Sequence, residues 1–254
     1  MGWGILGAVN QEILAVIDNL TRRKKFPWKK RSVYQGKIGD SDVVVMATGV
    51  GKVAAAAAAQ FVIDRFSVDC IVFTGVAGSV NPEIKVGDIV VCEKTVQHDF
   101  DMGGHGVFEK MGTPWFDSEP ELVQLALQAG KTLGWVERIK TGILLTGDQA
   151  IISSPKREWL WEKFHGDCVD MEGASVAMVC SCNEIPFLII RTITDRADEN
   201  ARADFRRTMS GAMFHSATMV LTMLNKGAKM KGCQRSLVSR VKKLLLTKKC
   251  STGI

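Results

Sequence analysis

The stretch VVVMATGVGKVAAAAAAQFVIDRFSVDCIVFTGV, residues 43–76, decides the fold. It opens on VVVMAT (43–48), a short apolar run with several β-branched residues, which is typical of a buried strand. GKVAAAAAAQFVIDRF (51–66) follows and is rich in alanine, the strongest helix former, and DCIVFTGV (69–76) again has the pattern of a buried strand. A strand, a helix and a second strand in this order predict two parallel strands joined by a crossover helix.

The same alternation continues on both sides of this stretch. Further strands are predicted at 3–8, 88–96, 138–146, 167–171 and 187–193, and further helices at 10–20, 118–133, from 154 onward, 173–183 and 203–224. This pattern indicates an α/β fold with a mainly parallel central sheet and helices on both faces. Because no repeat and no linker precedes residue 226, we expect one domain over residues 1–226 and a basic tail over residues 227–254.

Composition and cysteine usage narrow the class of protein. The 254 residues are 46% hydrophobic and 24% charged, as in ordinary globular domains. No apolar run approaches the ~18–20 residues of a membrane-spanning helix, and the N-terminal MGWGILGAVNQE lacks the basic segment of a signal peptide. The seven cysteines form no CxxC pair, and the four histidines show no metal-ligand spacing. We therefore expect a cytoplasmic protein with reduced, mostly buried thiols and no metal.

Positive charge is concentrated in two segments. Residues 229–254 hold eight Lys or Arg and no acid, so subtracting them from the net charge of +6 leaves −2 for the rest of the chain. A second cluster is RRKKFPWKKR (22–31). The core is therefore not predicted to bind nucleic acid. In the tail, Leu237, Val241, Leu244 and Leu245 recur at helical spacing. Two interpretations stay open, a packed or frayed terminal segment and a basic amphipathic helix in weak contact with anionic membranes.

Three acidic residues fall where strands end and helices begin. Glu12 opens the first predicted helix, Glu172 follows the strand that ends in VDM, and Asp195 ends the strand FLIIRTITD. Each alone can be a carboxylate that favours a helix terminus. Ligands of open α/β sheets bind at the carboxyl ends of the strands, so the three together indicate a site. Carboxylates without a metal suit cleavage of a glycosidic bond, where one acid protonates the leaving group and another activates water.

Two glycine-containing loops lie at the same predicted edge. GVGKVA (49–54) matches a dinucleotide-binding pattern, but the acid expected at the end of the next strand is missing, so a tight strand-to-helix turn is the favoured interpretation. In TGVAGS (74–79), the two glycines allow a backbone to approach a ligand closely.

Eight motifs occur in order over residues 4–200: GILGAVNQEI, TGVGKVAAA, FTGVAG, KVGDIVV, QHDFD, LTGDQAI, VDMEGASVA and RTITDRAD. As an ordered set they resemble the 5′-methylthioadenosine/S-adenosylhomocysteine nucleosidases of the nucleoside phosphorylase superfamily, to about residue 225. The resemblance implies a single α/β domain with a twisted mixed sheet between helices, a homodimer, and no metal or organic cofactor. The implied reaction is hydrolysis of the N-glycosidic bond of adenine thio-nucleosides.

The resemblance also assigns roles to seven residues. Glu12 would activate the attacking water, and Asp195 would donate a proton to the purine N7. Five others would bind the substrate or support the base: Gly78 near the ribose, Ile151 through its backbone to the purine, Met171 against the nucleoside, Glu172 at the sugar hydroxyls, and Arg191 beside Glu12.

The chain departs from the family pattern at two places. Ala150 stands where an aromatic residue usually stacks on adenine, and MGGHGVFEKMGTPWF (102–116), which should border the 5′ substituent, differs from the usual sequence.

Three alternative functions stay open. A phosphorylase needs a basic phosphate grip, whereas Val9-Asn10-Gln11-Glu12 would repel an anion and suits water. A hydrolase of aminodeoxyfutalosine-type nucleosides would use the same acids. A non-catalytic nucleoside-binding or adhesion protein would have no need for all three acids.

Overall fold

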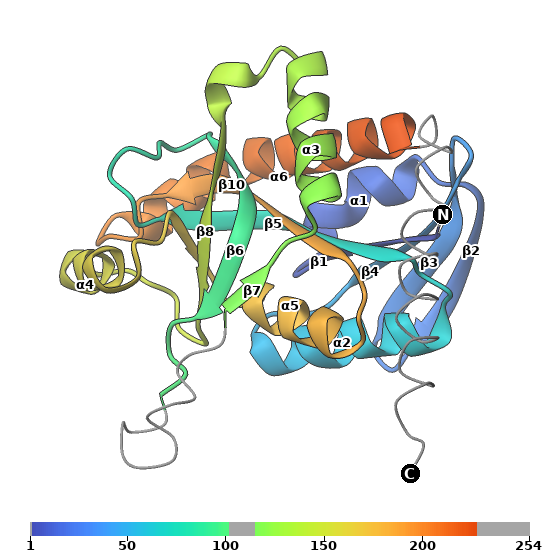
Figure 1. Ribbon diagram of the computed structural model, residues 1–254, viewed down its shortest axis with the longest axis horizontal. Helices are drawn as coiled ribbons and strands as arrows, with labels where there is room; N and C mark the ends of the chain where they lie inside the picture. The colour runs from blue at the N-terminus through green and yellow to red at the C-terminus, as the bar shows by residue number, and fades with distance from the viewer. Residues whose placement is uncertain (1, 102–114, 228–254) are drawn as a thin grey trace, which may run out of the picture.

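The computed structural model describes residues 2–101 and 115–227, and one ten-stranded mixed sheet forms the centre of this part of the chain (Figure 1). The strands are β1 (Gly2–Gly7), β2 (Thr21–Trp28), β3 (Arg31–Ile38), β4 (Ser41–Ala47), β5 (Cys70–Ser79), β6 (Ile89–Gln97), β7 (Trp115–Asp117), β8 (Ile139–Thr146), β9 (Cys168–Asp170) and β10 (Phe187–Asp195). The helices are α1 (Asn10–Asp18), α2 (Lys52–Arg65), α3 (Pro120–Thr132), α4 (Ser154–Phe164), α5 (Gly173–Cys182) and α6 (Ala201–Gly227). The predicted α/β class is confirmed.

The stretch 43–76 forms β4, α2 and β5, as its sequence predicts. Strand β1 lies between β4 and β5 and pairs with both of them in parallel. The carboxyl ends of these three strands therefore meet at one edge of the sheet.

The other half of the sheet closes on itself. Strand β10 pairs in parallel with β5 and antiparallel with β6, and β6 and β8 are parallel. Strand β9 is parallel to β8 and antiparallel to β5. Because this last pairing returns to β5, the strands β5, β10, β6, β8 and β9 form a ring, and the sheet is mixed as the family resemblance implies.

Helices cover both faces of the sheet (Figure 1). Helices α1, α3 and α6 pack on one face through buried residues such as Ile13, Leu122 and Val220. Helices α2 and α5 pack on the other face through residues such as Ala58 and Val176. This gives three layers. Helix α6 is also tied to the strands by the Ser216 hydroxyl, which donates to the Gly75 carbonyl at 2.8 Å.

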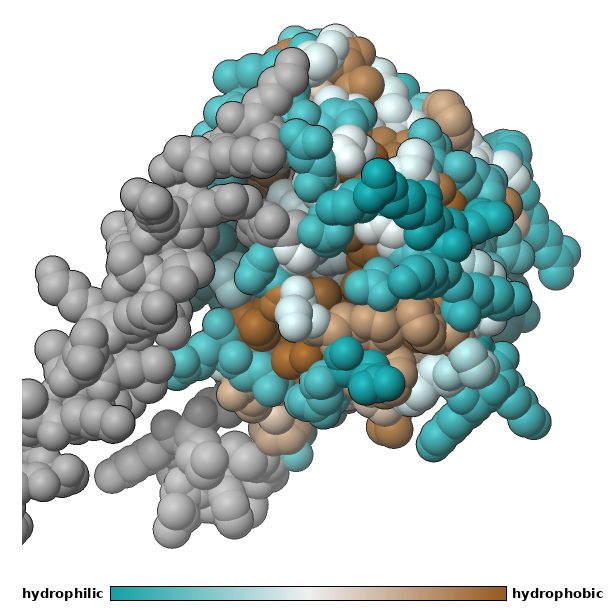
Figure 2. All heavy atoms as spheres, turned by 90° about the vertical axis from the view of Figure 1, so that its right-hand side faces the viewer, coloured by the Kyte–Doolittle hydropathy of each residue, from teal (hydrophilic) through white to brown (hydrophobic). Residues whose placement is uncertain are grey.

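The β2–β3 hairpin is absent from the sequence prediction. Strand β2 contains most of the basic cluster 22–31 and is exposed along almost its whole length at the edge of the sheet. Its sequence shows no clear apolar alternation, and its two aromatic side chains, Phe26 and Trp28, contact Phe66 and Phe61 of the α2 region, with ring centroids 5.9 Å and 4.9 Å apart. Hydrophilic residues predominate on this end of the molecule, around a smaller hydrophobic area (Figure 2).

One predicted helix starts later in the structure than in the sequence. Helix α3 begins at Pro120 and not at residue 118, and the Ser118 hydroxyl donates to the Cys92 carbonyl at 2.7 Å. Helix α4 begins at Ser154, as predicted.

Helix α6 continues to Gly227, one residue into the segment assigned to the tail. The predicted tail helix and most of the divergent segment 102–116 lie outside the described residues. Within the described ranges, no helix is long and apolar enough to cross a membrane, and the five cysteines found there are free, with only Cys182 exposed.

Candidate active site

A cavity of about 460 Å³ opens at the carboxyl ends of β1, β5, β9 and β10. Six of the seven predicted site residues line it: Glu12, Gly78, Ile151, Met171, Glu172 and Asp195. Arg191 is not among the lining residues, because its guanidinium lies beneath them and is only 1% exposed.

The Glu12 carboxylate is held by three backbone amides. One oxygen accepts from the N–H groups of Ala8 and Val9 at 2.6 and 3.1 Å, and the other accepts from the Val76 N–H at 3.1 Å. Glu12 is the third residue of α1, so it caps its own helix while it faces the cavity. Burial raises the pKa of Glu12, although Arg191 and the amides act in the opposite direction. A carboxylate with this environment is suited to accept a proton near neutral pH.

Glu172 sits at the N-cap position of α5 and is 6% exposed. Its carboxylate accepts the Gly51 N–H at 2.8 Å. Gly51 belongs to the turn that resembles a dinucleotide fingerprint, and it has a φ of 93°. The turn therefore positions Glu172, which agrees with the structural interpretation of this motif. Burial, reinforced by the charge of Asp170, raises the pKa of Glu172 to about 7.

A buried ion pair lies beneath Glu12 and Glu172. Arg191 donates to one Asp170 oxygen from Nε at 3.0 Å and from a terminal nitrogen at 2.7 Å. Asp170 also accepts the Thr146 hydroxyl at 2.6 Å and the Gly173 N–H at 2.9 Å. Burial alone would lower the pKa of Arg191, but the net shift is upward because Asp170 and Glu12 are close. Arg191 therefore acts on Glu12 through its charge, while its hydrogen bonds go to Asp170 and to the carbonyls of Phe73 and Ile190.

Asp195 ends β10 and lines the cavity near Gly78. Its two oxygens accept the Thr194 hydroxyl at 2.8 Å and the Ala197 N–H at 2.9 Å. Burial raises the pKa of Asp195. A raised pKa keeps a larger fraction of the carboxyl protonated, as a proton donor requires.

The glycines of the TGVAGS loop make room for carboxylates. A Cβ on Gly75 would lie 2.5 Å from a Glu12 oxygen, and a Cβ on Gly78 would lie 2.7 Å from an Asp195 oxygen. The sequence predicts close approach of a ligand to this loop. In the structure, the nearest atoms that a Cβ at either glycine would meet belong to the two candidate catalytic side chains.

The mouth of the cavity contains three residues that the sequence did not point to, together with Val50 of the GVGKVA turn. Val50, Phe205, Arg202 and Arg206 line it and are all exposed. Three of them come from the start of α6, where no motif of charged or aromatic residues marks a site. Ala150, where the family resemblance implies a base-stacking residue, also lines the cavity and is exposed.

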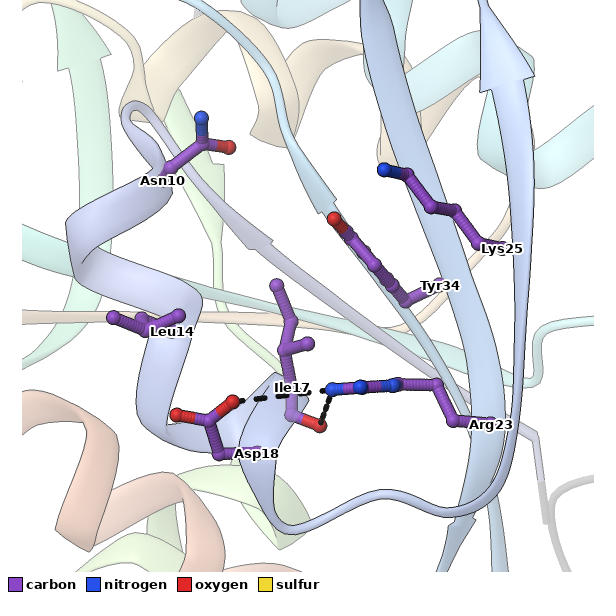
Figure 3. A pocket seen from close by; sticks show the side chains of 7 residues that line it. All are labelled: Asn10, Leu14, Ile17, Asp18, Arg23, Lys25 and Tyr34. Carbon is purple, nitrogen blue, oxygen red and sulfur yellow. Dashed lines mark hydrogen bonds and ion pairs between the residues drawn. The ribbon is translucent and has the colours of Figure 1, made fainter.

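A second cavity of about 480 Å³ lies between α1 and the β2–β3 hairpin (Figure 3). It is lined by Asn10, Leu14, Ile17, Asp18, Arg23, Lys25 and Tyr34. Its one carboxylate, on Asp18, lies 3.9 Å from Arg23. Because this cavity offers no pair of carboxyls for proton transfer, it does not compete as a catalytic site.

The described residues contain no group of three or more His, Cys, Asp or Glu that could hold a metal ion. Glu12, Glu172 and Asp195 are buried carboxyls with raised pKa values at the strand ends of a mixed α/β sheet, the kind of arrangement that general acid–base catalysis uses.

The chain belongs to the phosphorylase superfamily, since the model of that family matches residues 3–225. It is 34% identical over 225 residues to the aminodeoxyfutalosine nucleosidase of Campylobacter jejuni, covering 87% of this chain and 97% of the relative. It is also 34% identical over 231 residues to the 5′-methylthioadenosine/S-adenosylhomocysteine nucleosidase of Colwellia psychrerythraea, covering 88% and 95%. The structure of the Neisseria meningitidis nucleosidase in complex with methylthio-immucillin-A superposes with a TM-score of 0.83 at 31% identity, covering 89% and 99%.

Proposed function

We propose that the protein hydrolyses the N-glycosidic bond of 5′-methylthioadenosine and S-adenosylhomocysteine, giving adenine and the thioribose. The observation that carries this proposal is the arrangement of Glu12, Glu172 and Asp195 as buried carboxyls around one cavity. The Colwellia relative and the Neisseria structure supply the substrate class.

Asp195 and Glu12 each carry out one proton transfer in the proposed reaction. Protonated Asp195 donates its proton to N7 of the purine, so that the base leaves as a neutral molecule. Ionised Glu12 removes a proton from the water that attacks C1′ as the glycosidic bond breaks. The ribosyl group carries positive charge in the transition state, and the carboxylates beneath it stabilise that charge.

In this proposal, the remaining predicted residues bind the substrate or position other side chains. Ionised Glu172 accepts hydrogen bonds from the ribose hydroxyls, Met171 packs against the nucleoside, and Ile151 contacts the base. Gly78 lies beside Asp195 and leaves it space. Arg191 is a positioning residue, because it holds Asp170 and touches no part of the cavity.

Aminodeoxyfutalosine-type nucleosides are the second candidate substrate, because the Campylobacter relative is an aminodeoxyfutalosine nucleosidase. Phosphorolysis is disfavoured, since the acidic Glu12 stands where an anion would have to bind and the lining arginines Arg202 and Arg206 are at the exposed mouth.

The test is release of free base from 5′-methylthioadenosine, S-adenosylhomocysteine, aminodeoxyfutalosine and inosine by the purified protein. We expect adenine from the first two nucleosides. Release of base from inosine alone would contradict the proposal, and selective cleavage of aminodeoxyfutalosine would favour the second candidate.

We also propose that the enzyme is a cytoplasmic homodimer that acts in methionine salvage. The five cysteines within the described residues are free, which supports the location. Exposed apolar side chains on α2 and α5, such as Val53 and Met178, support a partner on the face that these two helices cover. Sedimentation equilibrium would test the dimer, and a monomer at micromolar concentration would contradict it.

For the tail, we propose weak contact with anionic membranes. Its eight basic residues follow α6, and Asn225 near the end of that helix lies by Gly39, in the turn after β3 of the basic hairpin. Two basic segments thus start from the same end of the domain.

A further inference from the structure

The cavity has an acidic floor and a basic mouth. Four buried carboxyl side chains line its inner part: Glu12, Asp170, Glu172 and Asp195. Arg202 and Arg206 line its outer part, and both are exposed. They are four positions apart on α6, so they project from the same side of the helix.

These two arginines have no ion-pair partner in the part of the chain that the structure describes. The neighbouring Arg207, by contrast, pairs with Asp204 at 2.7 Å. The nearby acids are also occupied, because Asp198 lies 3.8 Å from Arg157 and the Glu199 carboxylate accepts both the N–H and the hydroxyl of Ser154. Arg202 and Arg206 are therefore available to a bound molecule.

The buried position of the catalytic groups decides which part of a substrate lies near Arg202 and Arg206. In the proposed reaction, the purine and the ribose lie against buried groups, so the 5′ substituent is the part that extends toward the mouth. There it would meet Val50, which is 58% exposed, Phe205, which is 36% exposed, and the two guanidinium groups.

We propose that Arg202 and Arg206 give the enzyme a preference for nucleosides whose 5′ substituent ends in a carboxylate. This inference rests on the proposed function. It places S-adenosylhomocysteine, with its amino-acid substituent, and aminodeoxyfutalosine, with its benzoate, ahead of 5′-methylthioadenosine, whose 5′ substituent is neutral. Val50 and Phe205 contact the apolar atoms of the substituent, and the arginines contact its charge.

The test uses a matched pair of substrates, 5′-carboxypropylthio-5′-deoxyadenosine and its methyl ester, which differ in one charge. We expect wild-type kcat/KM to favour the acid by about two- to fivefold at low salt, the range of an exposed ion pair. The preference should reside in KM and should decrease as salt is added.

In the double variant Arg202→Gln/Arg206→Gln, the ratio of acid to ester should fall to about one. Arg207→Gln is the control on the same helix and should keep the wild-type ratio. Equal kcat/KM for acid and ester in the wild type, or an unchanged ratio in the double variant, would overturn the inference.

Calorimetric binding of the acid and the ester to Glu12→Gln separates this inference from the proposed function. Tighter binding of the acid without any cleavage by the wild type would support the basic mouth and contradict the hydrolase. Cleavage of both compounds at equal kcat/KM would support the hydrolase and contradict the proposed role of the basic mouth.

Discussion

At the scale of single residues, Glu12 and Asp195 divide the proton transfers between them. Replacing either by its amide keeps the shape but removes the proton acceptor or donor. Glu12→Gln and Asp195→Asn should each lower kcat by about 10²–10⁴-fold, the usual span for such groups. Initial rates of adenine release measure this effect. Glu162→Gln, at an exposed position on α4 outside the cavity, is the control. Near-normal turnover of both active-site variants would show that the roles are wrongly assigned.

Glu172 should make stability depend on pH. Its pKa is raised from 4.5 to about 7 in the folded protein, so the folded state holds the proton more tightly than the unfolded chain. Its contribution to stability is complete below pH 4.5 and is lost as the pH rises through about 7. Glu12 and Asp195 shift in the same direction.

Glu172→Gln should therefore raise the free energy of unfolding at about pH 8 by roughly 1–3 kcal/mol, with a smaller effect at about pH 5. Denaturant titration of the ligand-free protein at both pH values measures it. The same variant should lose most activity, because the charge beneath the ribosyl cation is gone. Equal stability changes at the two pH values would argue against a raised pKa.

Ala150 tests the position of the base. If adenine lies against this residue with free space, Ala150→Phe should lower KM for adenine nucleosides, since a base–aromatic stack contributes ~1–3 kcal/mol. If another aromatic side chain fills the space, overpacking should raise KM instead. Steady-state kinetics distinguish these results, and an unchanged KM would mean that residue 150 does not face the base.

At the scale of elements, the β5 loop keeps the carboxyls in place. Gly75→Ala would bring a Cβ to 2.5 Å from the Glu12 carboxylate and so displace it. We expect a large loss of kcat. Gly211→Ala on α6 is the control, since nothing lies within 4 Å of its Cβ, and it should leave turnover intact and stabilise the helix slightly. Wild-type kcat in Gly75→Ala would contradict the importance of this clearance.

The elements that the sequence predicts are those with regular burial. β4, α2 and β5 are recognisable because each has a buried face or is wholly buried. The β2–β3 hairpin is not, because β2 is an exposed, basic edge strand. The positions of Glu12, Glu172 and Asp195 around one cavity follow from strand ends. The sequence does not predict the ion pair between Arg191 and Asp170 or the hydrogen bond from Gly51 to Glu172, because both join segments that only the folded sheet brings together.

At the scale of the whole molecule, the tail and the domain should be separable. All proposed catalytic groups precede residue 196, so removal of residues 228–254 should leave kcat/KM intact. The truncated protein should lose any co-sedimentation with anionic liposomes that the full chain shows at low salt, because eight basic residues are removed. Loss of activity in a truncated protein with normal circular dichroism would instead link the tail to the cavity.

The choice between water and phosphate as the attacking group is the central question for this member of the phosphorylase superfamily. The direct measurement is phosphorus NMR of a reaction that contains 5′-methylthioadenosine, saturating inorganic phosphate and the enzyme. With Glu12 as the base for water, adenine should form at the same rate with and without phosphate, and no sugar-phosphate signal should appear. Accumulation of a ribose 1-phosphate in step with adenine would contradict hydrolysis.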